Sequence, residues 1–81
     1  MSPGVLALER LVELGVFAKG APRPGASIQY WPANRPSPRD WPHVAGLIHQ
    51  ASRFVGTRGL RVMRGRVGEE VVYAYNPAED R

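Results

Sequence analysis

The strongest structural signal lies in residues 37–77, which read SPRDWPHVAGLIHQASRFVGTRGLRVMRGRVGEEVVYAYNP. In the first part, apolar residues recur at three- and four-residue steps: Val44, Leu47, Ile48, Ala51, Phe54 and Val55. That spacing places them on one side of a helix. Ser37 supplies a hydroxyl cap, a proline follows it, and Asp40 stands three residues on, close to a capping box. The sequence therefore predicts a helix from Ser37 to Gly56 or Gly59, with Asp40 as a cap acid.

Two strand signals follow this helix, at residues 60–64 and 70–76, and two glycines mark the turn between them. Two registers fit the turn, and they place either Val62 or Leu60 opposite Tyr73. The registers differ by two residues, so both keep the same side chains on one face of the hairpin. The shared face is predicted to hold Leu60, Val62, Val71, Tyr73 and Tyr75.

The N-terminal segment predicts one more helix, over residues 4–15. Ser2 is the candidate N-cap, and Pro3 suits the first helical position. Gly15 is a natural left-handed stop, and Val16 beyond it can fold back onto the apolar side of the helix.

Residues 18–42 differ from the rest because six prolines exclude a long helix there. We interpret them as a proline-rich connection. Within it, residues 26–31 are free of proline and contain strand formers, which predicts a short edge strand. Trp31 and Trp41 bracket the second proline cluster and are expected to pin the loop onto the core.

Together these elements predict a single α+β domain over residues 1–77, in which two helices pack on a small antiparallel sheet. The expected order is helix, short strand, helix, β-hairpin. The last residues, 78–81, are predicted to fray.

Composition narrows the function classes. The chain has no cysteine and only two histidines, so thiolate metal sites are excluded and a zinc site is disfavoured. No pattern of catalytic residues stands out, and we predict a non-enzymatic protein without a cofactor. No secretory signal and no apolar run of about 18 residues occur, so we expect a cytoplasmic protein that does not enter the membrane.

Charge is distributed unevenly along the chain. Residues 19–68 hold nine basic groups against Asp40, for +8, whereas residues 1–18 sum to −1 and residues 69–81 to −3. A basic middle between acidic ends is typical of a protein that binds a polyanion. Arginine strongly outnumbers lysine, which coding bias also produces, but such bias does not explain why acids avoid residues 41–68.

Nucleic acid is therefore the predicted partner, with duplex DNA favoured over RNA. Forked, charge-assisted hydrogen bonds suit arginine to phosphate. The predicted phosphate contacts are Arg53, Arg58, Arg61, Arg64 and Arg66. Gln50 and His43 are the predicted readers of base edges, because they share an exposed stripe of the second helix with Gly46 and Arg53.

A helix with exposed Gln50 and Arg53, followed by an arginine-tipped hairpin, is similar to the second half of a winged helix-turn-helix domain. That resemblance implies a helix in the major groove and a hairpin that acts as the wing. It covers about half of the chain and rests on the order of elements, and residues 18–36 are too rich in proline to supply the missing third helix.

Two other functions remain open from the sequence. The first is a protein-binding inhibitor or assembly module of the phage or mobile-element type, anchored by Trp31, Trp41, Tyr30 or Tyr75. A homodimer is also compatible with the sequence. The second is a small ribonuclease of the toxin kind, with His43 as general base and Arg53 on the phosphate. Tryptophans packed in the core would favour nucleic acid, and exposed tryptophans beside an apolar patch would favour a protein partner.

Overall fold

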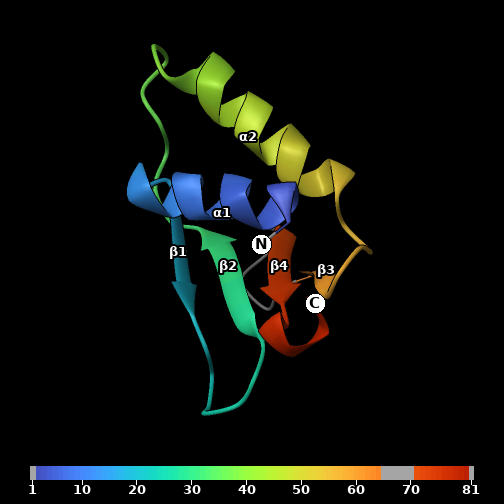
Figure 1. Cartoon of the computed structure of the whole chain (residues 1–81). Coiled ribbons are helices and arrows are strands. Elements are labelled where there is room, and N and C mark those ends of the chain that lie inside the picture. The colour runs from blue at the N-terminus through green and yellow to red at the C-terminus, as the bar shows by residue number, and fades with distance from the viewer. Residues whose placement is uncertain (1, 65–70, 81) are drawn as a thin grey trace.

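The computed structural model describes residues 2–64 and 71–80, and these form two α-helices, a four-stranded antiparallel sheet and a short 3₁₀ turn (Figure 1). The elements follow in the order α1 (Pro3–Glu13), β1 (Phe17–Gly20), β2 (Ile28–Pro32), α2 (Trp41–Arg53), β3 (Leu60–Arg64), β4 (Val71–Tyr75) and η1 (Pro77–Glu79). The predicted α+β class is therefore confirmed.

Helix α1 begins and ends as its sequence predicts. The Ser2 hydroxyl accepts a hydrogen bond from the Val5 amide at 3.3 Å, and Pro3 is the first helical residue. Gly15 adopts φ +75°, and the Val16 amide beyond it donates to the Leu11 carbonyl at 3.1 Å. The chain thus turns back at once and enters β1.

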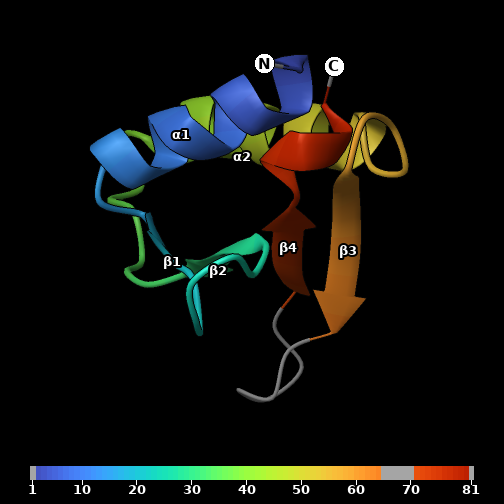
Figure 2. The same cartoon turned by 60° about the horizontal axis from the view of Figure 1, so that its bottom comes forward.

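The sheet has the strand order β1-β2-β4-β3, in which both hairpins join through the antiparallel pair β2–β4. In the second hairpin Leu60 pairs with Tyr75 and Val62 with Tyr73, which selects one of the two predicted registers. Both helices lie on the same side of this sheet, and among the described residues no helix covers the other side (Figure 2).

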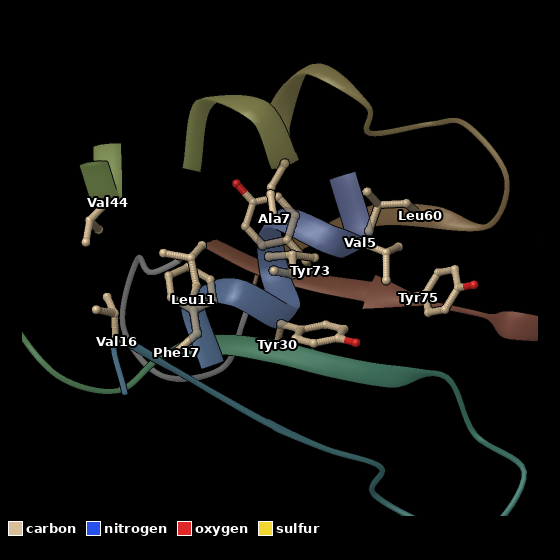
Figure 3. Close-up of a cluster of buried hydrophobic side chains, with 12 residues drawn as sticks. Val5, Ala7, Leu11, Val16, Phe17, Tyr30, Val44, Leu60, Tyr73 and Tyr75 are labelled. Atoms are coloured by element: carbon tan, nitrogen blue, oxygen red, sulfur yellow. The ribbon is translucent and has the colours of Figure 1, made fainter. Parts of the chain in front are cut away.

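One core lies between the helices and the covered sheet face (Figure 3). Its fully buried side chains come from α1, α2 and the strands β2 and β3: Val5, Leu8, Leu11, Tyr30, Val44, Ala51 and Leu60. The remaining members of the predicted α2 stripe, Leu47, Ile48, Phe54 and Val55, pack partly buried against this cluster. The helical spacing in the sequence therefore identified the packed side of α2 correctly.

Two sequence predictions about residues 18–42 were wrong. Strands β1, which begins at Phe17, and β2 form a complete hairpin here, where the sequence predicted a connection with one short strand. Strand β2 is internal and not an edge, since β1 pairs with one side of it and β4 with the other. Its proline, Pro32, is tolerated because the pairing of β2 with β4 ends at Tyr30, so β2 is unpaired on that side at Pro32.

Helix α2 also starts later than predicted, at Trp41 with Asp40 as the N-cap residue. Ser37 does not cap the helix; its hydroxyl donates to the Asp40 carboxylate at 2.8 Å. Asp40 therefore occupies the cap position, although its side chain makes no capping hydrogen bond.

The C-terminal residues assigned to a frayed tail contact the sheet as far as they are described. Tyr75 donates to the Asp80 carboxylate at 2.6 Å, and Arg61 pairs with Glu79 at 3.4 Å. The hydrogen bond to Asp80, together with burial and the charge of that carboxylate, raises the pKa of Tyr75 to about 12.

A polar cluster ties α1 to the first hairpin. The Tyr30 hydroxyl donates to Glu9 at 2.7 Å, and the Lys19 ammonium contacts both oxygens of the same carboxylate. Burial alone raises the pKa of Glu9, but the hydrogen bonds from Tyr30 and Lys19 and the lysine charge outweigh it, so the pKa lies below its ordinary value. Burial and the neighbouring carboxylate raise the pKa of Tyr30.

Candidate nucleic-acid interface

The outward side of α2 carries the two predicted readers of base edges, His43 and Gln50, and the predicted phosphate contact Arg53. His43, Gln50 and Arg53 are exposed, whereas Val44 and Ala51 point into the core from the opposite side. The helix lies at the periphery of the fold, beside α1 (Figure 1). Its 13 residues make a helix about 20 Å long. A helix of this length fits the major groove of duplex DNA, which is about 12 Å wide, with its two ends at the DNA strands that border the groove.

Arg53 and Arg58 both lie near Phe54 at the C-terminal end of α2. The guanidinium carbon of Arg53 lies 5.8 Å from the centroid of the Phe54 ring. Phe54 and Arg58 line one shallow hollow together with Ser2, Pro3 and Thr57. Phe54 therefore connects two cations that the sequence separates by five positions.

A tight loop fixes Arg58 after the helix. The Gly56 amide donates to the Leu60 carbonyl at 2.6 Å, and the Thr57 hydroxyl donates to the Phe54 carbonyl at 2.6 Å. Within this frame Arg58 adopts φ +47°, the one positive φ among the described residues other than glycine. Such a conformation costs about 1 kcal/mol for a residue with a side chain.

Two further arginines, which the sequence analysis did not select, flank the N-terminal end of α2. Arg39 immediately precedes the N-cap, and Arg35 lines a hollow of about 220 Å³ together with His43. They were missed because residues 18–42 were interpreted as a connection. A signal was present, since four arginines and one acid occupy residues 33–58.

The residues of this surface carry more positive than negative charge, but two acids lie beside them. Asp40 lines the same hollow as Arg35, and the charge of Arg58 contributes, after the hydrogen bond from Tyr75, to the lowered pKa of Asp80. Arg35, Arg39, Arg53 and Arg58 stand against Asp40 alone between residues 33 and 58, a net charge of +3. Within the described part of the chain, the ion pairs hold Arg10, Lys19 and Arg61 instead. Among the described residues no ion pair joins Asp40 to these arginines, and the Asp40 carboxylate accepts a hydrogen bond from Ser37.

Arg61 belongs to a different surface. It lies on β3 beside Ala74 of β4, on the sheet face that neither helix covers. The same face holds Trp31, which covers Gly20: a Cβ at that glycine would lie 3.4 Å from the ring carbon Cη2 of Trp31. Arg61 therefore does not share one continuous surface with Arg53 and Arg58.

Of the two remaining predicted arginines, Arg64 lies at the described end of β3. The backbone of Arg64 pairs with Val71 at the last described position of β3. Arg66, which the sequence predicts at the hairpin tip, lies outside the described residues.

The four predicted aromatic anchors divide into two pairs. Tyr30 and Tyr75 are buried and hydrogen-bonded to carboxylates, so they are structural in the folded chain. Trp41 is 55% exposed at the start of α2, and Trp31 is partly buried. The tryptophans are therefore not members of the buried core, contrary to the expected pinning role of Trp41.

The geometry of α2 separates the two groups suggested for a ribonuclease. His43 and Arg53 are ten positions apart, which corresponds to about 15 Å along the helix axis. That separation favours contacts with different phosphates over one shared catalytic site. Across residues 2–64 and 71–80, no cluster of three or more His, Cys, Asp or Glu side chains is arranged to hold a metal ion.

The winged-helix resemblance is not confirmed, because the described hairpin β3–β4 is half of a four-stranded sheet and not a separate wing. None of the helices described is both long and apolar enough to cross a membrane. Comparison with known proteins gave no matching family model, no matching curated protein and no matching solved structure.

Proposed function

We propose that this chain is a small, non-enzymatic nucleic-acid-binding protein of the cytoplasm that binds duplex DNA through the outward side of α2. It acts as a transcription regulator or as an accessory factor. The observation that carries the proposal is the exposed stripe His43–Gln50–Arg53 on a peripheral helix whose two ends are flanked by arginines.

The chemistry of this stripe suits base edges. Arginine bonds guanine through two donors, and glutamine bonds adenine through a donor and an acceptor, both in the major groove. Arg53 and Gln50 are three positions apart on α2 and are therefore neighbours on its surface. In this proposal His43, about two helical turns before Gln50, approaches a base edge nearer the N-terminus of α2.

Phosphates are the partners of the flanking cations. Arg35 and Arg39 precede α2 and Arg58 follows it, so contacts to the two strands bordering a groove would fix the helix in place. Arg61 lies on the uncovered sheet face, and Arg64 ends β3, so both belong to secondary contacts in this proposal.

The test is fluorescence anisotropy with labelled random duplex DNA and with single-stranded RNA of equal length, at matched salt. We expect tighter binding to the duplex. Tighter binding to RNA would leave α2 as the proposed binding surface but make RNA, and not duplex DNA, the proposed partner. Absence of binding to either at low salt would contradict the proposal.

A matched pair of variants locates the surface. Arg53→Ala and Arg10→Ala each remove an exposed arginine from the last turn of a helix, and α1 carries Arg10 in an ion pair with Glu13. Affinity for DNA should fall in Arg53→Ala and stay unchanged in Arg10→Ala. Equal losses would show nonspecific dependence on total charge.

The exposure of Trp41 favours a second candidate, a protein-binding or self-associating module. Exposed aromatic side chains of this size are enriched at interface hot spots. In that case Trp41→Ala would abolish association measured by light scattering, and Arg53→Ala would leave it unchanged.

A further inference from the structure

Gly46 lies in the middle of α2, where glycine disfavours the helix. The structure offers no reason for it inside the fold. A Cβ built at this position would have no neighbouring atom within 4 Å, and the residue has no positive φ.

The other described glycines each have a structural reason. Gly15, Gly25, Gly56 and Gly59 adopt positive φ values. A Cβ at Gly4 would lie 2.7 Å from Leu60, and one at Gly20 would touch the Trp31 ring. Within the described chain Gly46 alone has neither cause.

Its position links it to the proposed interface. Gly46 lies one turn before Gln50 and two turns before Arg53, on the outward side of α2. Side chains of a helix lean toward its N-terminus, so Gln50 leans in the direction of Gly46. The space above the Gly46 backbone nevertheless stays open.

We infer that Gly46 is the point of closest approach between α2 and a duplex, where the missing side chain lets a base-pair edge come against the helix backbone. This inference rests on the proposed function and adds a residue that sets the depth of the helix in the groove. Gln50 and Arg53 then reach base edges because the helix sits close to the groove floor.

The test uses Gly46→Ala and Gly46→Leu, with two readouts. Alanine and leucine both favour a helix more than glycine does, and the space around position 46 is open. Each variant should therefore raise Tm, by about 2–8 °C for Gly46→Ala. The leucine should lower duplex affinity about tenfold or more, the range that loss of a base-edge contact covers, and the alanine should lower it less. Ala21→Leu, at an exposed position beyond β1, adds similar bulk away from α2 and should leave affinity unchanged.

The outcomes separate the two claims. If Gly46→Leu binds DNA like the unsubstituted chain while Arg53→Ala does not, the close approach is wrong and the proposed function stands. A fall in Tm for Gly46→Ala would reveal a role inside the fold and overturn the inference. Absence of DNA binding by the unsubstituted chain would overturn both.

Discussion

The guanidinium of Arg53 lies above the ring of Phe54, with its central carbon 5.8 Å from the ring centroid. A cation in this position is attracted by the ring, by about 0.5–1 kcal/mol at an exposed site. Phe54 itself packs partly buried against the core. The core therefore holds the ring in place, and the ring orders the arginine that we assign to the DNA contact.

Replacing Phe54 by leucine tests this link. Leucine keeps apolar contact with the core but removes the ring, so affinity for duplex DNA should fall about two- to fivefold. The effect should vanish when Arg53 is already alanine, as a double-mutant cycle by anisotropy would show. An equal loss in both backgrounds would mean that Phe54 acts independently of Arg53.

Two leucines of α1 should differ in how much they contribute to stability, because Leu8 is fully buried and Leu6 is 55% exposed. Leu8→Ala should lower the free energy of unfolding by about 2–5 kcal/mol, because it removes packed methyl groups and leaves a cavity. Leu6→Ala should change it by about 0.5 kcal/mol or less. Urea unfolding of both variants measures the difference, and similar losses would contradict the orientation of α1.

The Glu9–Tyr30 hydrogen bond predicts a dependence on pH. Because the folded pKa of Glu9 lies below its ordinary 4.5, this carboxylate stabilises the fold above that pH, and the contribution is lost as pH falls through the folded pKa. Tyr30→Phe should cost about 1–3 kcal/mol at neutral pH. Urea unfolding of both proteins should show this difference shrink in acid, and a constant difference would exclude the charged carboxylate as its source.

Two glycines of the loop between α2 and β3 allow the cost of backbone strain to be measured apart from the cost of a steric clash. Gly56 and Gly59 both have positive φ, but only at Gly59 would a Cβ collide, at 2.6 Å from the Asn76 carbonyl oxygen. Gly56→Ala should destabilise by about 1–2 kcal/mol through its backbone alone. Gly59→Ala should lower the stability measured by thermal unfolding by more than Gly56→Ala does. Equal losses would show that the backbone at Asn76 moves away from the added methyl group.

Local signals in the sequence were sufficient for several elements. The Ser2 cap, the Gly15 stop and the apolar stripe of α2 each depend on residues within one or two turns, and all are confirmed. The hairpin face that holds Leu60 and Val62 also follows from alternation alone.

Strand β1 could not be predicted in this way. It has four residues, Phe17–Gly20, and follows a helix after a short turn, which is too few for a period to appear. Its position depends on Lys19, which reaches Glu9 from ten residues away, and on pairing with β2. Without β1, β2 had no second neighbour and was expected at an edge.

The candidate site was predicted in part for a related reason. The helical period placed Gln50 and Arg53 on the exposed side of α2, where they lie. Only the tertiary fold shows that Arg35 lines a hollow with His43, and that Arg61 lies on the sheet face turned away from the two helices. Distances between separate elements do not follow from spacing along the chain.

The most direct measurement is the salt dependence of duplex DNA binding for the unsubstituted chain, for Arg53→Ala with Arg58→Ala, and for Arg61→Ala. Each lost phosphate contact should lower the log–log slope by about 0.9. Of the α2 pair, Arg58 is the proposed phosphate contact and Arg53 the proposed base-edge contact, so we predict a clear loss of affinity with a fall in slope of about 0.9 for the pair, and little change in either for Arg61→Ala. A fall confined to Arg61→Ala would place the DNA on the uncovered sheet face and contradict the account.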